Sequence, residues 1–114
     1  MKIIFKDGQE LEISNFNYRY DTETGTMGDL SEPSEQYAIL IYSITNATEV
    51  LSAVKSVFTP ENISEVIIVT EEFVTDENGE ESVVEKRVNF SFSKLLSISM
   101  NLSDTTNNMD IRLK

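Results

Sequence analysis

The stretch that decides the fold spans residues 66 to 92 and has the sequence VIIVTEEFVTDENGEESVVEKRVNFSF. It begins with apolar, β-branched residues, passes through Asp76-Glu77-Asn78-Gly79, and then alternates apolar and polar residues from Val84 onward. Asn-Gly between two such segments is typical of a β-hairpin and favours a type I′ turn, in which both residues have positive φ. We therefore expect two antiparallel strands joined by this turn.

Strand patterns also precede the hairpin. Residues 2–6, with the apolar run Ile3-Ile4-Phe5, predict a first strand that is closed by Asp7-Gly8, and a second strand follows over residues 11–13. The apolar parity then changes; because strand side chains alternate between faces, this change predicts a β-bulge near Ser14-Asn15. The new parity carries an aromatic row that is either a binding stripe or a face packed on the core: Phe16, Tyr18 and Tyr20.

Alternation after the hairpin continues from Val84 to Leu102. At about 3.4 Å per residue, this segment is too long for one strand of a small domain. We expect a break near Lys94-Leu95, where the parity is interrupted, and a last short strand over residues 109–113. The polar parity carries a row of serines that either faces solvent or lies against another sheet: Ser91, Ser93, Ser97 and Ser99.

Two further segments complete the predicted fold. Asn46 and Glu49 fit a capping box, and apolar residues from Val50 to Phe58 recur at helical spacing. Residues 37–42 are apolar on both parities, as in a central strand that is covered on both faces, or on one face with a partner on the other. The sequence thus predicts the α+β class, with a mainly antiparallel β-sheet and one amphipathic helix, about residues 47–58, packed on one face.

The chain has 114 residues, the usual size of one domain, so residues 1–114 are expected to fold as a single domain. A long acidic loop is expected at about residues 21–35, which contain five acids and no base. Loops of this length within a compact domain are often functional.

Charge and composition exclude several kinds of function. With 9 Lys+Arg against 20 Asp+Glu, the formal net charge is −11, which disfavours direct binding to nucleic acid or to an anionic membrane. The sequence has no cysteine and no histidine, so it lacks thiolate nucleophiles, the usual base at neutral pH and common metal ligands. No phosphate-binding or nucleophile motif replaces them, and we expect a protein that is not an enzyme and has no catalytic, cofactor or metal site.

Acidic residues concentrate between Glu61 and Glu85, a span with nine acids and no base. Such a run either protects a hairpin edge against sheet pairing or forms a docking surface for a basic partner. Residues two apart on one face of a strand lie roughly 7 Å apart, close to the phosphate spacing of a nucleic-acid strand. The candidate partner-binding residues lie on the hairpin and the long loop: Glu71, Asp76, Glu77, Glu80, Glu81 and Glu85, with Asp29, Glu32 and Glu35.

Four short motifs follow one another along the chain: Ile3-Ile4-Phe5-Lys6-Asp7-Gly8-Gln9-Glu10-Leu11, then Thr48-Glu49-Val50-Leu51, Glu61-Asn62-Ile63-Ser64 and Leu95-Leu96-Ser97-Ile98-Ser99. In these motifs and their order the chain resembles small proteins encoded in the tail-gene region of phages and prophages of Gram-positive bacteria. The resemblance implies a virion-associated or tail-associated role and brings no catalytic residues.

Two functions are therefore expected. The first is that of a phage structural or accessory protein of the tail or baseplate region, which acts through contacts with other subunits in a homo-oligomer or virion assembly. The alternative is an acidic nucleic-acid mimic that inhibits a host defence protein, an anti-CRISPR-like role, by binding its basic groove.

The expected location is the virion or the host cytoplasm. The apolar run near the N-terminus is too short for a classical signal peptide, and no stretch is long enough for a membrane span.

Overall fold

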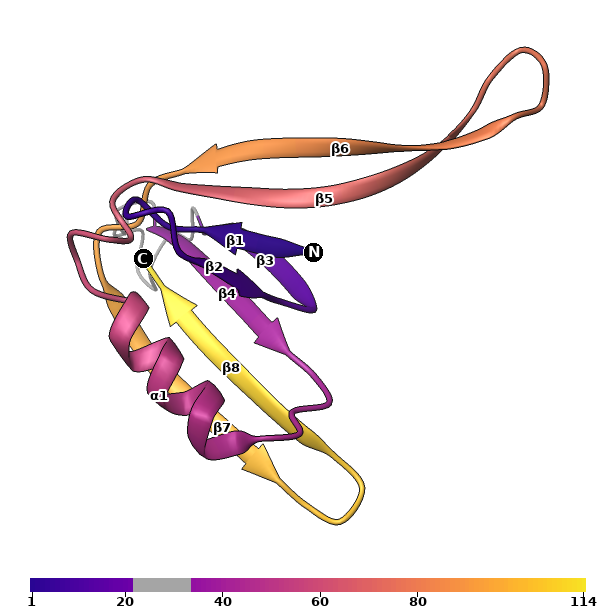
Figure 1. Ribbon diagram of the computed structural model, residues 1–114. Coiled ribbons are helices and arrows are strands. Elements are labelled where there is room, and N and C mark those ends of the chain that lie inside the picture. The colour runs from indigo at the N-terminus through magenta and orange to yellow at the C-terminus, as the bar shows by residue number, and fades with distance from the viewer. Residues whose placement is uncertain (22–33) are drawn as a thin grey trace, which may run out of the picture.

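The computed structural model describes residues 1–21 and 34–114, and it confirms the predicted α+β class with two four-stranded antiparallel sheets and one helix. Sheet A has the strand order β2 (Glu10–Glu12), β1 (Lys2–Ile4), β5 (Val66–Thr75) and β6 (Glu81–Phe90). Sheet B has the order β3 (Asn15–Asp21), β4 (Ser34–Ile41), β8 (Asn107–Leu113) and β7 (Leu95–Leu102). The helix α1 (Ala47–Val57) lies between β4 and β5 in the sequence (Figure 1).

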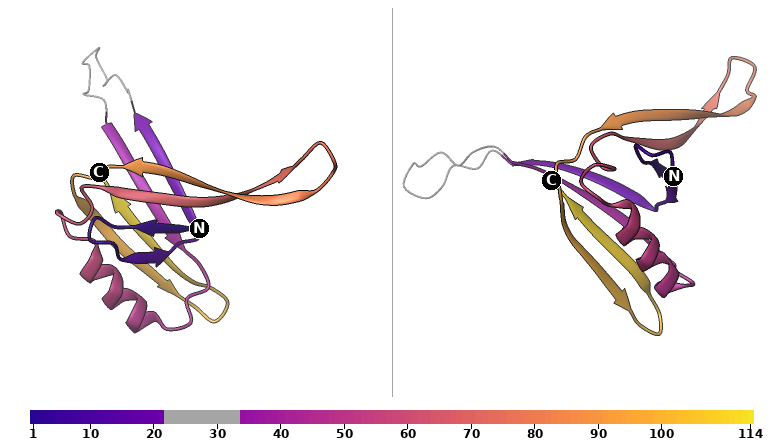
Figure 2. Two further views of the ribbon diagram at one scale, coloured as in Figure 1. Left: turned by 45° about the horizontal axis from the view of Figure 1, so that its top comes forward. Right: turned by 60° about the vertical axis from the view of Figure 1, so that its left-hand side comes forward.

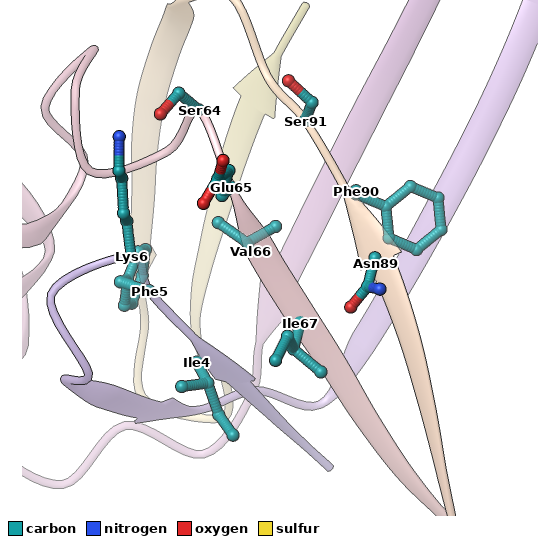
Figure 3. A pocket seen from close by; sticks show the side chains of 10 residues that line it. All are labelled: Ile4, Phe5, Lys6, Ser64, Glu65, Val66, Ile67, Asn89, Phe90 and Ser91. Carbon is teal, nitrogen blue, oxygen red and sulfur yellow. The ribbon is translucent and has the colours of Figure 1, made fainter.

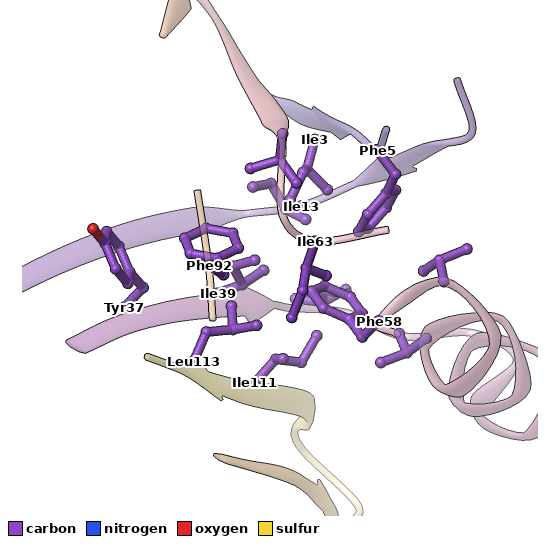
Figure 4. Packing of buried hydrophobic residues seen from close by; sticks show 14 of the residues in the cluster. Ile3, Phe5, Ile13, Tyr37, Ile39, Phe58, Ile63, Phe92, Ile111 and Leu113 are labelled. Carbon is purple, nitrogen blue, oxygen red and sulfur yellow. The ribbon is translucent and has the colours of Figure 1, made fainter. Parts of the chain in front are cut away.

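One hydrophobic core joins both sheets and the helix. Sheet A covers one part of the inner face of sheet B, and α1 lies over another part (Figures 1 and 2). The helix therefore packs on one face of a sheet, as predicted. Buried side chains from all of these elements meet in the core: Ile3 and Ile68 of sheet A, Ile39 and Ile111 of sheet B, Val54 of α1, and Ile63 and Phe92 of the connections. Figure 4 shows Ile3, Ile39 and Ile111 with Ile63 and Phe92 in this cluster.

The chain changes sheets between β2 and β3, where the sequence predicts a β-bulge. The Ile13 N–H donates to the Met1 carbonyl at 3.0 Å, whereas the Ser14 N–H donates to the carbonyl of Leu40 in β4 at 2.8 Å. Residues up to Ile13 thus belong to sheet A and residues after Ser14 to sheet B. The predicted bulge is wrong, because the apolar parity changes with the sheet and not through an inserted residue.

The predicted break after β6 is confirmed, since β6 ends at Phe90 and β7 begins at Leu95. Phe92 is buried in this connection, and its N–H donates to the Ile63 carbonyl at 2.9 Å. A register shift between Leu95 and Ser97 then leaves Leu96 43% exposed. The connection therefore carries a core residue between two strands that belong to different sheets.

The predicted central strand is β4, which pairs with β3 on one side and with β8 on the other. Its side chains at Tyr37, Ile39 and Ile41 are buried in the core. On the outer face of sheet B, Ser97 and Ser99 of β7 lie opposite Arg112 and Asp110 of β8 and are exposed. In the described part of the chain these serines therefore face solvent. The predicted last strand is β8, which lies inside sheet B between β4 and β7.

The helix begins at the predicted cap, because the Asn46 side-chain oxygen accepts a hydrogen bond from the Glu49 N–H at 3.4 Å. The predicted acidic loop is too long at both ends. Asp21 is the last residue of β3 and pairs with Ser34, and Glu35 pairs with Tyr20. Backbone pairing between β3 and β4 thus extends into a segment whose acidic composition alone predicts a loop.

Candidate interaction surface

The β5–β6 hairpin extends beyond the rest of the molecule (Figures 1 and 2). β5 pairs with β1 only as far as Val69, which lies opposite Lys2, whereas its pairing with β6 continues to Thr75 and Glu81. Every residue from 71 to 89 is exposed. We call this two-stranded segment, residues 71–89, the arm. Both of its faces are open to solvent.

The turn at the tip of the arm differs from the predicted type I′ turn. Gly79 has a φ of 80°, but Asn78 does not have positive φ, since Ser43 is the one non-glycine residue with positive φ in the described part of the chain. The Gly79 N–H donates to the Asp76 carbonyl at 3.0 Å, and the Asp76 N–H donates to the Glu80 carbonyl at 2.9 Å. This pattern is typical of a type I turn followed by a left-handed glycine.

The Asp76 side chain explains this choice of turn. Its Oδ1 accepts hydrogen bonds from the N–H groups of Asn78 at 2.9 Å and Glu80 at 2.8 Å. An aspartate that bonds the backbone two residues later stabilises a turn with ordinary φ values. The aspartate at the start of the loop therefore outweighs the preference of Asn-Gly for type I′.

Apolar side chains project from both faces of the arm. On one face Phe73 lies opposite Val83, and they are 77% and 53% exposed. The other face carries Val74, Val84 and Val88, which are also largely exposed. In most antiparallel sheets such alternation turns the apolar side toward a core, but no second layer from the described residues lies beneath the arm. Apolar groups gathered on an exposed surface are typical of a site that binds another molecule.

The charges of the arm are mainly negative and partly paired. The Lys86 ammonium lies 2.6 Å from the Glu72 carboxylate, and the Arg87 guanidinium lies 3.1 Å from the Glu85 carboxylate. Glu71 lies directly opposite Glu85, and like charges in this position destabilise a strand pair. Exposed ion pairs contribute little to stability, so these charges influence binding more than folding.

The structure separates the predicted acidic residues into groups. Glu71 and Glu85 face each other along the arm, Asp76, Glu77, Glu80 and Glu81 gather at its tip, and Glu35 lies in β4 of sheet B. Val83 stands between Glu81 and Glu85 on the same face, so carboxylates do not follow one another at every second residue of the strand. Asp29 and Glu32 lie outside the described residues.

Glu35 belongs to an aromatic cluster and not to a loop. Its carboxylate accepts hydrogen bonds from the hydroxyls of Tyr18 at 3.1 Å and Tyr37 at 3.4 Å. Burial of Tyr37, and then the negative charge of Glu35, raise the pKa of the Tyr37 hydroxyl. The predicted aromatic row is divided: Phe16 stacks on Tyr37 with ring centres 5.9 Å apart, whereas Tyr18 and Tyr20 are about half exposed.

A hollow of about 520 Å³ lies where the arm joins the body (Figure 3). Ile4 and Ile67, which are opposite each other in sheet A, form part of its apolar lining, and its ionisable groups are Lys6 and Glu65. Ser64 and Ser91 also line it, and the Ser64 hydroxyl donates to the Glu61 carbonyl at 2.6 Å. The lining is therefore mixed, with apolar residues beside hydroxyl and charged groups.

Within residues 1–21 and 34–114, no group of three or more acidic side chains is placed to hold a metal ion. The helix in these residues has 11 residues and lacks the length and hydropathy needed to cross a membrane.

Comparison of the chain with protein-family models, with curated proteins and with solved structures gives no match.

The residues that sequence reasoning missed are the apolar ones of the arm, above all Phe73 and Val83. A signal for them is present in the sequence, because Phe73 shares its parity with Glu71, and Val83 shares its parity with Glu81 and Glu85. A strand face that mixes large apolar residues with acids is not suited to a core. This mixture identifies an exposed apolar surface with a charged rim.

Proposed function

We propose that this chain is a non-enzymatic structural or accessory protein of the tail or baseplate region of a phage, and that it acts through protein–protein contacts made by the arm. The observation that supports the proposal is the exposure of both faces of the arm, with Phe73 77% exposed at the centre of one of them. The order of the sequence motifs supplies the phage context.

A partner on the arm would stabilise a segment that is weak alone. A two-stranded hairpin in water is marginally stable, and cross-strand pairs such as Phe73 with Val83 add little to it. Covering Phe73 and Val83 contributes about 25 cal/mol for each Å² of apolar surface removed from water. The surrounding carboxylates favour a partner with cationic groups at the edge of the contact. We expect a contact that is apolar at its centre and sensitive to salt at its rim.

The test uses purified virions and two matched variants. Mass spectrometry should detect the wild-type chain in the particles. Phe73→Asp, which places a charge at the centre of the apolar surface, should remove it from them. Leu102→Asp changes an apolar residue of β7 that is 56% exposed and should leave incorporation unchanged. Absence of the wild-type chain from virions, or incorporation of the Phe73 variant at the wild-type level, contradicts the proposal.

A second candidate is the acidic inhibitor of a host defence protein that binds nucleic acid. It is favoured by the tip of the arm, where Asp76, Glu77, Glu80 and Glu81 form no ion pair with any residue in the described part of the chain. Such a surface would bind a basic groove quickly and lose affinity steeply with salt. Reversal of Glu77, Glu81 and Glu85 to lysine should abolish binding to a nucleic-acid-guided nuclease at low salt. Unchanged binding would exclude this candidate.

A further inference from the structure

Among residues 1–21 and 34–114, no strand pairs with the outer edge of β6, because β6 is the last strand of sheet A. The hydrogen bond from the Asp76 N–H to the Glu80 carbonyl closes the hairpin, so the pair Thr75 and Glu81 is a non-hydrogen-bonded pair of the β5–β6 ladder. Hydrogen-bonded and non-hydrogen-bonded pairs alternate along an antiparallel ladder. The residues of β6 whose N–H and C=O groups point to the free edge are therefore the odd-numbered ones: Glu81, Val83, Glu85, Arg87 and Asn89.

This edge lacks two of the usual protections against strand pairing. The chain has only 2 prolines, at positions 33 and 60, and the pairing of β5 with β6 continues without a register shift from Val66 to Thr75. Natural edge strands often carry a proline or a bulge that prevents addition of another strand. The charges on the β6 edge are of both signs, and their order makes the strand complementary to itself.

We infer that a second copy of this chain pairs with β6 through its own β6, antiparallel and about a twofold axis at Lys86. In this register Glu85 lies opposite Arg87 of the second copy, and Arg87 lies opposite Glu85 of the second copy. A shift of two residues in one direction places Glu85 opposite Glu85, and in the other direction Arg87 opposite Arg87. Like charges directly opposite destabilise a pair of strands, so charge selects this one register.

The remaining pairs of this register are also compatible. On the other face Val84 lies opposite Val88 of the second copy, which would cover side chains that are 45% and 50% exposed. The two Lys86 residues lie opposite each other at the axis, but each ammonium is already 2.6 Å from Glu72 of its own chain. Two free arms would thus become one four-stranded segment, above the three strands that give a sheet independent stability.

The acidic tip of each arm would also lie near lysine residues of the second copy. In this register Glu81 reaches the level of Ser91 of the second copy, where the connection to β7 begins. Lys94 lies in that connection, and its N–H donates to the Lys114 carbonyl at 3.2 Å, so two lysines are adjacent there. The unpaired acids at the tip would therefore approach the cations that follow β6. The inference rests on the proposed role of the arm in protein–protein contacts and names a second copy as one partner.

The first experiment uses charge reversal at the proposed pair. Light scattering at increasing concentration should show a dimer of the wild-type chain, because dimerisation follows mass action. Glu85→Arg and Arg87→Glu each create two like-charge pairs and should raise the dimer Kd by about tenfold or more. A mixture of the two variants should form heterodimers, and the double variant should recover the wild-type Kd, since both restore opposite charges.

The matched control is Asp104→Arg, which changes the charge by the same amount in the exposed turn between β7 and β8 and should leave the Kd unchanged. Circular dichroism verifies that each variant is folded. A strictly monomeric wild-type chain, or single variants that dimerise as well as the wild type, would overturn the inference. Association of the chain with virions is measured separately, so loss of the dimer leaves the proposed function standing.

A second experiment reports the register directly. The chain has no cysteine, so a single introduced cysteine is the one site of disulfide formation. Opposite residues in a non-hydrogen-bonded pair have Cα atoms about 4.5 Å apart, within the range that a disulfide spans. Lys86→Cys should therefore give a covalent dimer on mild oxidation. Ser82→Cys lies about 27 Å from its counterpart in this register and should not. Equal cross-linking of the two variants would exclude the register.

Discussion

The same substitution at two phenylalanines should destabilise the protein to very different extents. Phe92 is 2% exposed and its ring lies 4.7 Å from that of Tyr37, whereas Phe73 is 77% exposed. Truncation of a buried phenylalanine to alanine costs about 3–5 kcal/mol through lost burial and the cavity that remains. Only about a quarter of the Phe73 side chain is covered, so at about 3 kcal/mol for full burial its truncation should cost less than about 0.8 kcal/mol.

Urea unfolding followed by circular dichroism measures both values. A protein concentration of about 1 µM keeps pairing between chains from adding to stability. Phe92→Ala should lower the urea midpoint strongly, and Phe73→Ala should leave it close to that of the wild type. A loss of more than about 2 kcal/mol for Phe73→Ala at this concentration would mean that the arm packs on the body, and would refute the reasoning that treats it as a free surface.

Three further substitutions each test one position. Asn62 is buried and joins two segments, since its amide donates to the Val57 carbonyl at 2.9 Å and its Oδ1 accepts from the Asp7 N–H at 3.0 Å. Asn62→Ala should therefore lower the free energy of unfolding, measured with urea, by about 2 kcal/mol. Gly79 has φ 80° and open space around a built Cβ, so Gly79→Ala should cost about 1 kcal/mol from backbone strain alone, measured by thermal unfolding. Burial and Glu35 raise the pKa of Tyr37 above its ordinary 10.0, so its stabilising contribution is complete below pH 10.0 and is lost as pH rises through the raised pKa. Tyr37→Phe should therefore reduce the fall of the urea midpoint above pH 10.0, relative to the wild type.

The parts of the fold that could be predicted from the sequence are those set by local patterns. The hairpin, the helix cap at Asn46 and the break before Leu95 each depend on residues that are neighbours in the chain. The pairing of β5 with β1 and the central place of β8 depend on which distant strands meet, and periodicity carries no information on that. For the same reason the change of sheet at Ser14 was indistinguishable from a bulge.

The candidate surface was predictable in its charge but not in its exposure. The sequence predicts a turn at Gly79, and the acids that flank this glycine must therefore lie at the tip of the arm. Alternation identifies residues 71–75 and 81–89 as strands, but it cannot say whether a second layer lies over them. Phe73 is therefore compatible with a core in the sequence and lies in solvent in the structure. Phe73 lies in solvent because the arm extends beyond sheet B, the layer that would otherwise cover it (Figure 2).

The arm departs from the local rules that the rest of the chain obeys. Glu71 opposes Glu85, and valines project from the face opposite to that of Phe73, so burial does not stabilise this ribbon and its two exposed ion pairs stabilise it only weakly. Elsewhere apolar residues meet in one core, and natural sequences usually break such rules where function requires it. A strand added at the β6 edge would reduce both the repulsion between like charges and the exposure of the valines. It brings Arg87 of a second copy toward Glu85, which lies opposite Glu71, and it places Val88 of the second copy beside Val84. The features that are unfavourable in one chain are therefore those that pairing between two chains would offset.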